Sequence, residues 1–260
     1  MKFIYIISII CLIIYFINSK NKRKNILVMF SGGLDSTTSL YKLLKKTDYN
    51  IYVHHIILKD NSNRWKNELI SCNKIINELK KIRNFEYSES MVDINLFSND
   101  KLGGSRQDDL IIIAFIASMI CGVESYKKID SLVISELKYE LTNSKNLINN
   151  MINTINVFKW SSIKEKLYDP LENFYKLTNC KVNQKNIKNL EKMLESFKTE
   201  ETKSELKNIK SKLNKIICIK RQMYNFLPKN IKKHITFCRN PINNKNCNKC
   251  FNCLMYKEII

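Results

Sequence analysis

The chain has 260 residues, with 44 Lys and Arg against 24 Asp and Glu, and its formal net charge at pH 7 is +20. Only five Gly and three Pro occur, and no internal repeat is evident, which excludes a repeat architecture. Without the first 25 residues, about 235 remain, which is enough for one α/β domain with a sizeable core.

The N-terminal segment is apolar. Phe3 to Ile17 carries no charge, and a basic cluster follows it at Lys20, Lys22, Arg23 and Lys24. The run is shorter than the roughly 20 residues of a full membrane span, although snorkelling flanks could extend it. The basic flank favours a single anchor over residues 3–18 that holds the rest of the chain on the cytosolic face of a membrane. A cleaved secretory signal and a mistranslated extension of a cytoplasmic protein remain as alternatives.

Residues 26–46 predict a strand, a tight loop and a helix. Ile26 to Phe30 is an apolar run typical of a buried parallel strand, and leucines then recur at helical spacing. Two glycines between them allow several N–H groups to point at one anion, beside the positive end of the helix dipole. We therefore expect a nucleotide phosphate site at Phe30, Ser31, Gly32, Gly33, Leu34, Asp35, Ser36 and Thr37.

The side chains of this loop suit phosphate chemistry. Ser31, Ser36 and Thr37 offer hydroxyl donors, and Asp35 is a candidate to hold Mg²⁺ or to orient the attacking group. A Walker-type loop would need a Lys after the second Gly, and the dinucleotide fingerprint G-x-G-x-x-G is not matched either. The plain alternative is an ordinary Gly-Gly turn between a strand and a helix.

The pattern beyond the loop alternates strands and helices and predicts an α/β fold with a parallel sheet. The expected strands are 51–58, 85–92 and 131–135, and the expected helices are 65–82, 106–122, 144–157 and 184–216. A ligand belongs at the carboxyl ends of such strands, where the loop would lie. His54 and His55 alternate within the second strand, so we expect at most one of them to face inward.

The basic excess concentrates in residues 181–233. Lysines recur there on a helical background with Leu190, Leu194, Leu206 and Leu213, which predicts one basic and one apolar face. Such a surface attracts polyanions by counterion release, so nucleic acid is an expected partner of these helices. A solvated, lysine-rich helical face is the alternative.

Four cysteines near the C-terminus have the spacing C-x8-C-x2-C-x2-C, at Cys238, Cys247, Cys250 and Cys253. Two-residue gaps let neighbouring sulfurs converge on one ion, so we expect a closed, structural Zn²⁺ site. An iron–sulfur cluster is the main rival. The other cysteines lie among apolar residues and are predicted to be small core or membrane side chains, at Cys11, Cys72, Cys121, Cys180 and Cys218.

The loop SGGLDS at residues 31–36 resembles the PP-loop ATP pyrophosphatase superfamily, whose members cleave ATP between the α and β phosphates. Together with the cysteine spacing, SGGLDSTT at 31–38 makes the chain similar to the 7-cyano-7-deazaguanine synthases of queuosine biosynthesis. A Pro-Leu-x4-Lys element of that family is matched by Pro170-Leu171 and Lys176, and a turn before a long apolar helix is matched more weakly by Ser105-Arg106-Gln107. Of the family's Gly-Gln-x-His-x-x-Glu segment, residues 62–68 keep only Glu68. The family's run that helps to shape the base pocket has no counterpart in residues 135–146.

The resemblance implies an adenine nucleotide alpha hydrolase-like, Rossmann-like domain at 25–180 and a lysine-rich helical segment with the zinc site at 181–260. It implies a ligase that uses ATP and ammonia to convert 7-carboxy-7-deazaguanine to the nitrile. A homodimer is one assembly that the sequence allows. Asp35 and Ser36 would serve the phosphates and Mg²⁺, while Lys176 and Arg106 would offset phosphate charge. A tRNA-modifying PP-loop enzyme that adenylates a base, and a non-catalytic, membrane-tethered nucleotide-binding protein, are the alternatives.

Overall fold

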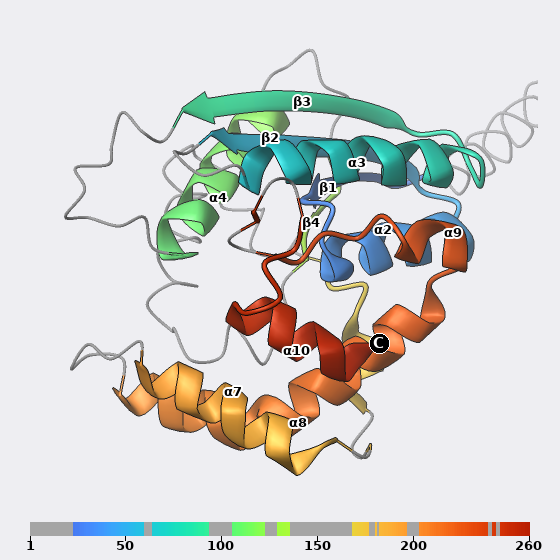
Figure 1. Cartoon of the computed structure of the whole chain (residues 1–260). Helices are drawn as coiled ribbons and strands as arrows, with labels where there is room; N and C mark the ends of the chain where they lie inside the picture. The colour runs from blue at the N-terminus through green and yellow to red at the C-terminus, as the bar shows by residue number, and fades with distance from the viewer. Residues whose placement is uncertain are drawn as a thin grey trace, which may run out of the picture.

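The computed structural model describes residues 23–59, 64–93, 106–122, 129–135, 168–176, 180, 182–196, 203–238, 241–242 and 245–260. Figure 1 shows its elements in chain order. The strands are β1 (Asn25–Phe30), β2 (Asn50–Lys59), β3 (Glu86–Asp93) and β4 (Ser131–Ile134). The helices are α2 (Leu34–Lys46), α3 (Arg64–Lys80), α4 (Arg106–Gly122), the 3₁₀ turn η3 (Glu172–Lys176), α7 (Gln184–Ser196), α8 (Lys203–Phe226), α9 (Lys229–Lys232) and α10 (Phe251–Ile259).

The four strands form one sheet in the order β3-β2-β1-β4, and every neighbouring pair is parallel. This confirms the predicted α/β class and the parallel sheet. β1 is central and buried along its whole length, as expected for a strand that is covered on both faces. Phe30, the last residue of β1, pairs with His55, so β2 continues four residues beyond the point where the loop leaves the sheet.

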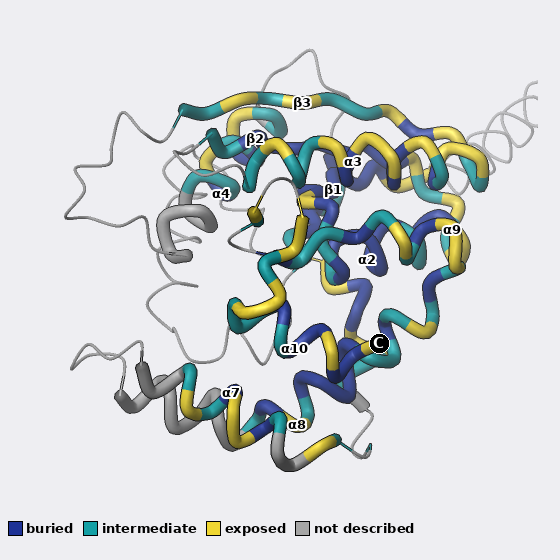
Figure 2. The backbone as a smooth tube through the Cα atoms, viewed as in Figure 1, coloured by how far each residue is buried: buried dark blue, intermediate teal, exposed yellow. Residues whose placement is uncertain are grey.

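Helices cover both faces of the sheet (Figure 1). Ile26, Val28 and Phe30 belong to a core that includes residues of α2 and α3, whereas Leu27 and Met29 pack in a second core with residues of α4. Successive residues of a strand point to opposite faces, and each buried aliphatic or aromatic side chain contributes about 1.5–3 kcal/mol. The alternation within β1 therefore holds helices on both sides, and Figure 2 shows its buried backbone between them.

A helical layer formed by α7, α8 and α10 packs beside α2, below the sheet in the view of Figure 1. The predicted single helix 184–216 is wrong, because the structure has two separate helices, α7 and α8. Folding α7 back along α8 buries Leu190 and Leu213 in one core, which a single straight helix could not do. The predicted helix 144–157 lies outside the described residues.

Both histidines of β2 are buried, so the prediction that at most one faces inward is wrong. The reason is that the parallel sheet has no solvated face here. His54 Nδ1 lies 2.8 Å from the hydroxyl of Ser88 and its Nε2 lies 3.0 Å from that of Ser90, both on β3. His55 Nδ1 lies 2.8 Å from the carbonyl oxygen of Phe30 and donates to it.

The buried environment of His54 predicts a loss of stability in acid. Burial, aided by His55, lowers the pKa of His54 to about 4, against an opposing effect of Glu89. In the unfolded chain the pKa is about 6.5, so the unfolded state binds the extra proton between pH 6.5 and 4. The stability that neutral His54 contributes is complete above pH 6.5, and about 3 kcal/mol of it is lost as the pH falls to 4.

Urea unfolding at pH 7 and at pH 4.5 measures this effect. The His54→Gln variant cannot take up the proton, so its free energy of unfolding should fall less between the two pH values than that of the natural chain. Equal falls in both proteins would show that His54 does not govern the acid response.

Two cysteines that were predicted to be separate core residues form a disulfide. Cys180 and Cys218 are bonded, with their Cα atoms 5.6 Å apart. The pairing could not be read from the sequence because it depends on tertiary packing of the segment at residue 180 against α8. Cys72 is buried as predicted and forms no disulfide. Cys121 is half-buried and forms no disulfide among the described residues, and Cys11 lies outside them.

Among the helices that the structure describes, none combines the length and the apolar character needed to cross a bilayer. The apolar run that was predicted as an anchor, residues 3–18, lies outside the described part of the chain. Membrane attachment through this run stays a prediction.

Candidate functional site

The loop between β1 and α2 has a backbone that requires glycine at one position. Gly32 has φ +70°, in the left-handed region that side chains disfavour. A Cβ on Gly32 would lie 2.8 Å from Cys72 Sγ and 3.3 Å from the backbone nitrogen of Cys72, in the middle of α3. The loop therefore turns sharply and packs directly against α3, which only a residue without a side chain allows.

The amino end of α2 follows immediately. Gly33 is its N-cap in an extended conformation and supplies no side-chain cap, and the first intrahelical bond runs from Thr37 N–H to the Gly33 carbonyl. The N–H groups of a first helical turn have no partner within the helix, and the helix dipole adds positive potential there. This geometry suits an anion such as phosphate.

Ser36 holds the loop closed. Its hydroxyl accepts from the Ser31 N–H at 3.3 Å, lies 3.1 Å from the Ser31 hydroxyl and donates to the Gly33 carbonyl at 3.3 Å. Ser36 and Thr37 are buried, whereas Ser31 is exposed. In this structure Ser36 supports the shape of the loop, and Ser31 is the hydroxyl of the loop that faces solvent.

The carboxylate of Asp35 pairs with a lysine from the far end of the chain. Lys220 Nζ on α8 lies 3.1 Å from Asp35 Oδ2, and the two side chains are only 11% and 18% exposed. Sequence reasoning missed Lys220 as a site residue because it counted this lysine with the basic surface. The position of Lys220 in the helix could have shown that it is buried. It lies four residues after Ile216 and three before Met223, so it shares a helix face with these two buried residues.

Three aromatic rings cluster at the carboxyl-terminal helix. Tyr256 of α10 stacks on Phe237 with ring centroids 3.6 Å apart, and meets Tyr224 of α8 edge to face at 5.6 Å. Burial raises the pKa of the Tyr256 hydroxyl, and Tyr224 and the Asp35 carboxylate raise it further. The influence of Asp35 places the carboxyl-terminal helix within electrostatic reach of the loop.

Two predicted site residues, Arg106 and Lys176, lie at the first position of α4 and the last position of η3. Their side chains lie outside what the structure describes, so their predicted roles stay predictions. The Pro-Leu element beside Lys176 has a structural role: Leu171 is fully buried in the core, and Pro170 accepts a hydrogen bond from Lys42 Nζ of α2 at 2.5 Å.

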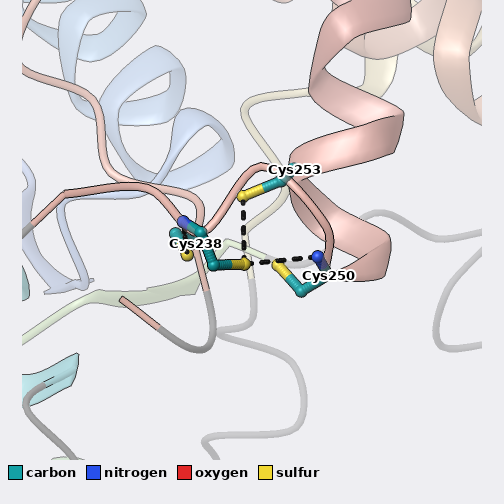
Figure 3. Close-up of side chains that lie close together, drawn as sticks. Cys238, Cys250 and Cys253 are labelled. Atoms are coloured by element: carbon teal, nitrogen blue, oxygen red, sulfur yellow. Dashed lines mark hydrogen bonds between the residues drawn. The ribbon is translucent and has the colours of Figure 1, made fainter. Parts of the chain in front are cut away.

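The four predicted cysteine ligands come together. The sulfur atoms of Cys238, Cys247, Cys250 and Cys253 all lie within 4.8 Å of one another, and Figure 3 shows three of them converging where the C-terminal loop enters α10. Four thiolates about 2.3 Å from one tetrahedral Zn²⁺ would stand about 3.8 Å apart. The Cys247 and Cys253 sulfurs are 3.8 Å apart, so the cluster has the size for a single ion.

Backbone geometry prepares this cluster for a metal ion. Asn248 lies between two of the cysteines with φ 58°, a conformation that Asn tolerates better than most residues. The resulting turn directs the Cys250 N–H to Cys247 Sγ, and the Cys247 N–H donates to Cys238 Sγ, both at 3.2 Å. The N–H of Lys249, with that of Cys250, lowers the pKa of Cys247 to about 6, which favours the thiolate that a metal requires.

Two of the other thiols of the cluster are more protected. Cys238 and Cys253 are buried, and burial together with the neighbouring cysteines raises the pKa of Cys253 well above its usual value. A bound cation would offset that effect, because a coordinating thiol loses its proton to the metal. The donor set and its spacing thus fit a closed, structural metal site.

No family model matches the chain, and no curated protein is detectably similar to it. The arguments for function therefore come from the residues and their geometry. The fold and the site define an α/β protein with a parallel sheet, a glycine loop before a helix at the carboxyl end of the central strand, and a four-cysteine cluster able to hold one metal ion.

Proposed function

We propose that the protein is an ATP-dependent ligase of the PP-loop type that converts 7-carboxy-7-deazaguanine to 7-cyano-7-deazaguanine. The observation that carries the proposal is the loop at 31–36, with Gly32 in the left-handed region and the uncapped start of α2 at the carboxyl edge of the parallel sheet. The resemblance of SGGLDSTT and of the cysteine spacing to that enzyme family supplies the reaction.

In the proposed reaction, the substrate carboxylate attacks the α-phosphorus of ATP and the bond between the α and β phosphates breaks. Pyrophosphate leaves, and ammonia then displaces AMP from the acyl adenylate to give the amide. The amide oxygen then attacks the α-phosphorus of a second ATP, and a second pyrophosphate leaves. Loss of AMP and protons from the adenylated amide yields the nitrile. The enzyme must hold pyrophosphate and position the carboxylate, because adenylation turns a poor electrophile into one with a good leaving group.

The residues of the loop fit these demands. The N–H groups at the start of α2 would bind the phosphate chain. In the free protein the ammonium of Lys220 pairs with Asp35. When nucleotide binds, this ammonium would pair with a phosphate oxygen instead. The carboxylate of Asp35 could then hold Mg²⁺ together with the phosphates. Ser36 keeps the loop in shape through its bonds to Ser31 and Gly33.

The cysteine cluster has a structural role in this proposal. Its sulfurs lie close enough for one Zn²⁺, whereas an iron–sulfur cluster is a larger body and would hold its thiolates farther apart. Held by these four cysteines, Zn²⁺ would fix the loop that leads into α10. That helix packs on α7 and on α8, and α8 carries Lys220. Zinc would stabilise the helices beside the loop rather than activate water. Four cysteines occupy every coordination position of a tetrahedral ion and leave none for a water molecule.

The test is an assay of the full chain with ATP, Mg²⁺, ammonia and 7-carboxy-7-deazaguanine, read by mass spectrometry for the nitrile and by release of AMP. We expect the nitrile from the natural chain and a fall of about 100-fold in kcat/KM for Lys220→Met, the loss typical of removing one preorganised donor to a developing charge. The exposed Lys229 of α9 supplies the matched control, and Lys229→Met should retain activity.

Other outcomes identify the alternatives. Release of pyrophosphate only when tRNA is added would replace the proposal by a base-adenylating, tRNA-modifying enzyme. Absence of AMP under every condition would leave a nucleotide-binding protein without catalysis. Nucleic-acid binding through the lysine-rich helices stays a prediction, since the side chains of residues 203–211 in α8 lie outside the described ones.

A further inference from the structure

The hydroxyl of Tyr256 has no hydrogen-bond partner among the residues that the structure describes, although it is fully covered. The whole side chain is held tightly, because Tyr256 is only 4% exposed and its ring is fixed against Phe237 and Tyr224. Buried polar groups in native proteins are nearly always hydrogen-bonded, and an exception calls for a reason such as a missing ligand.

The surroundings of Tyr256 indicate where such a partner would lie. Tyr224, which its ring meets edge to face, follows Lys220 by four residues on α8, so the two share one face of that helix. Lys220 in turn is bonded to Asp35 in the first turn of α2. This chain of contacts leads from Tyr256 to the amino end of α2, and Asp35 is one of the charges that raise the Tyr256 pKa.

The Tyr256 hydroxyl and the Lys220 ammonium can both donate hydrogen bonds to an anion. A tyrosine hydroxyl donates one hydrogen bond, and a lysine ammonium offers donors only. Lys220 donates to Asp35 Oδ2 in the free protein. A phosphate chain at the start of α2 would bring several acceptor oxygens to the same place, and hydrogen bonds to such charged oxygens are short and strong.

We propose that the Tyr256 hydroxyl donates a hydrogen bond to a phosphate oxygen of the nucleotide held by the loop at 31–37. This inference rests on the proposed function, which it extends by naming a further binding residue. It also gives the carboxyl-terminal segment a direct part in nucleotide recognition, since Tyr256 lies one helical turn after the metal-site residue Cys253.

The test compares the full chain with Tyr256→Phe, which removes the hydroxyl alone. Titration calorimetry with ATP and Mg²⁺ should give a dissociation constant about tenfold higher for the variant, the usual size for one hydrogen bond to a charged group. The affinity for inorganic pyrophosphate should fall by a similar factor. The affinity for adenosine, which has no phosphate, should not change. The thermal midpoint of the free variant should equal or exceed that of the natural chain, because no bond is lost in the free protein.

Tyr224→Phe is the matched control, because it removes a hydroxyl from the neighbouring ring while the ring contact stays. Its ATP affinity should match that of the natural chain. Equal ATP affinity in Tyr256→Phe and the natural chain would overturn the inference and leave the proposed function standing. The inference would also be overturned if Tyr256→Phe without ligand had a lower thermal midpoint and its affinity for adenosine fell as much as its affinity for ATP. That result would show that the hydroxyl has a structural role. Failure of the natural chain to bind ATP would remove both proposals.

Discussion

Replacing Gly32 by alanine is expected to remove nucleotide binding and to destabilise the protein. At φ +70° an alanine is strained by about 1–2 kcal/mol. Its Cβ would also lie 2.8 Å from the sulfur and 3.3 Å from the backbone nitrogen of Cys72, so α3 or the loop must shift. Interiors are close-packed, and such overpacking costs typically 1–3 kcal/mol more. The shifted loop would no longer direct its N–H groups at phosphate.

Urea unfolding and titration with ATP and Mg²⁺ measure the two effects of Gly32→Ala separately. The neighbouring glycine is the matched control. Gly33 has φ −75°, which any residue adopts, and a Cβ there would meet only the Ser31 hydroxyl oxygen at 3.4 Å. Gly33→Ala should therefore change stability by less than about 1 kcal/mol. An unchanged free energy of unfolding in Gly32→Ala would contradict the loop geometry described above.

Removal of the metal is expected to release α10 and to lower nucleotide affinity at the same time. The free energy of metal binding to a structural site is folding free energy, and here the ion would tie the loop at 238–250 to the first turn of α10. α10 also packs against α7 and α8, so we expect partial rather than global unfolding. A fall of roughly 10 °C in the thermal midpoint corresponds to a few kcal/mol for a chain of this size.

The measurement is thermal unfolding, with metal analysis, of the natural chain before and after chelation and of Cys250→Ser. One zinc per chain is expected in the natural protein, and chelation and the substitution should lower the midpoint alike. Cys121→Ser is the control, since Cys121 lies on α4, outside the cluster, and keeps its thiol. Detection of iron and sulfide in the natural protein would show that the cysteines hold an iron–sulfur cluster instead of zinc. A metal-free chain whose thermal midpoint does not change on chelation would contradict a structural metal site.

Much of the molecule was predictable from local pattern. The apolar run at 26–30 and the leucines of the next helix have the periods of a buried strand and a helix, and the structure has β1 and α2 there. The alternation of strands and helices allowed few arrangements other than a parallel sheet, and the sheet of the structure is parallel, with the strand order β3-β2-β1-β4. The cysteine spacing predicted a cluster because residues a few positions apart must lie close together in space.

Contacts between distant segments were decided by the tertiary structure. Lys220 and Asp35 are 185 residues apart, and no periodicity relates them, so the lysine was counted with a solvated basic face. The same holds for the disulfide between Cys180 and Cys218 and for the contact of Tyr256 with Tyr224. Each depends on how α8 packs against another segment of the chain, which is set by the fit of whole apolar faces.

The sequence by itself therefore determined the strand, the glycine loop, the helix and the cysteine group, because each depends on residues close along the chain. The tertiary structure decided which charge meets Asp35 and which rings pack on Tyr256. It also decided that both faces of the sheet are covered, so that His54 and His55 are both buried. Local backbone preferences act over a few residues, whereas burial and charge pairing depend on segments that only folding brings together.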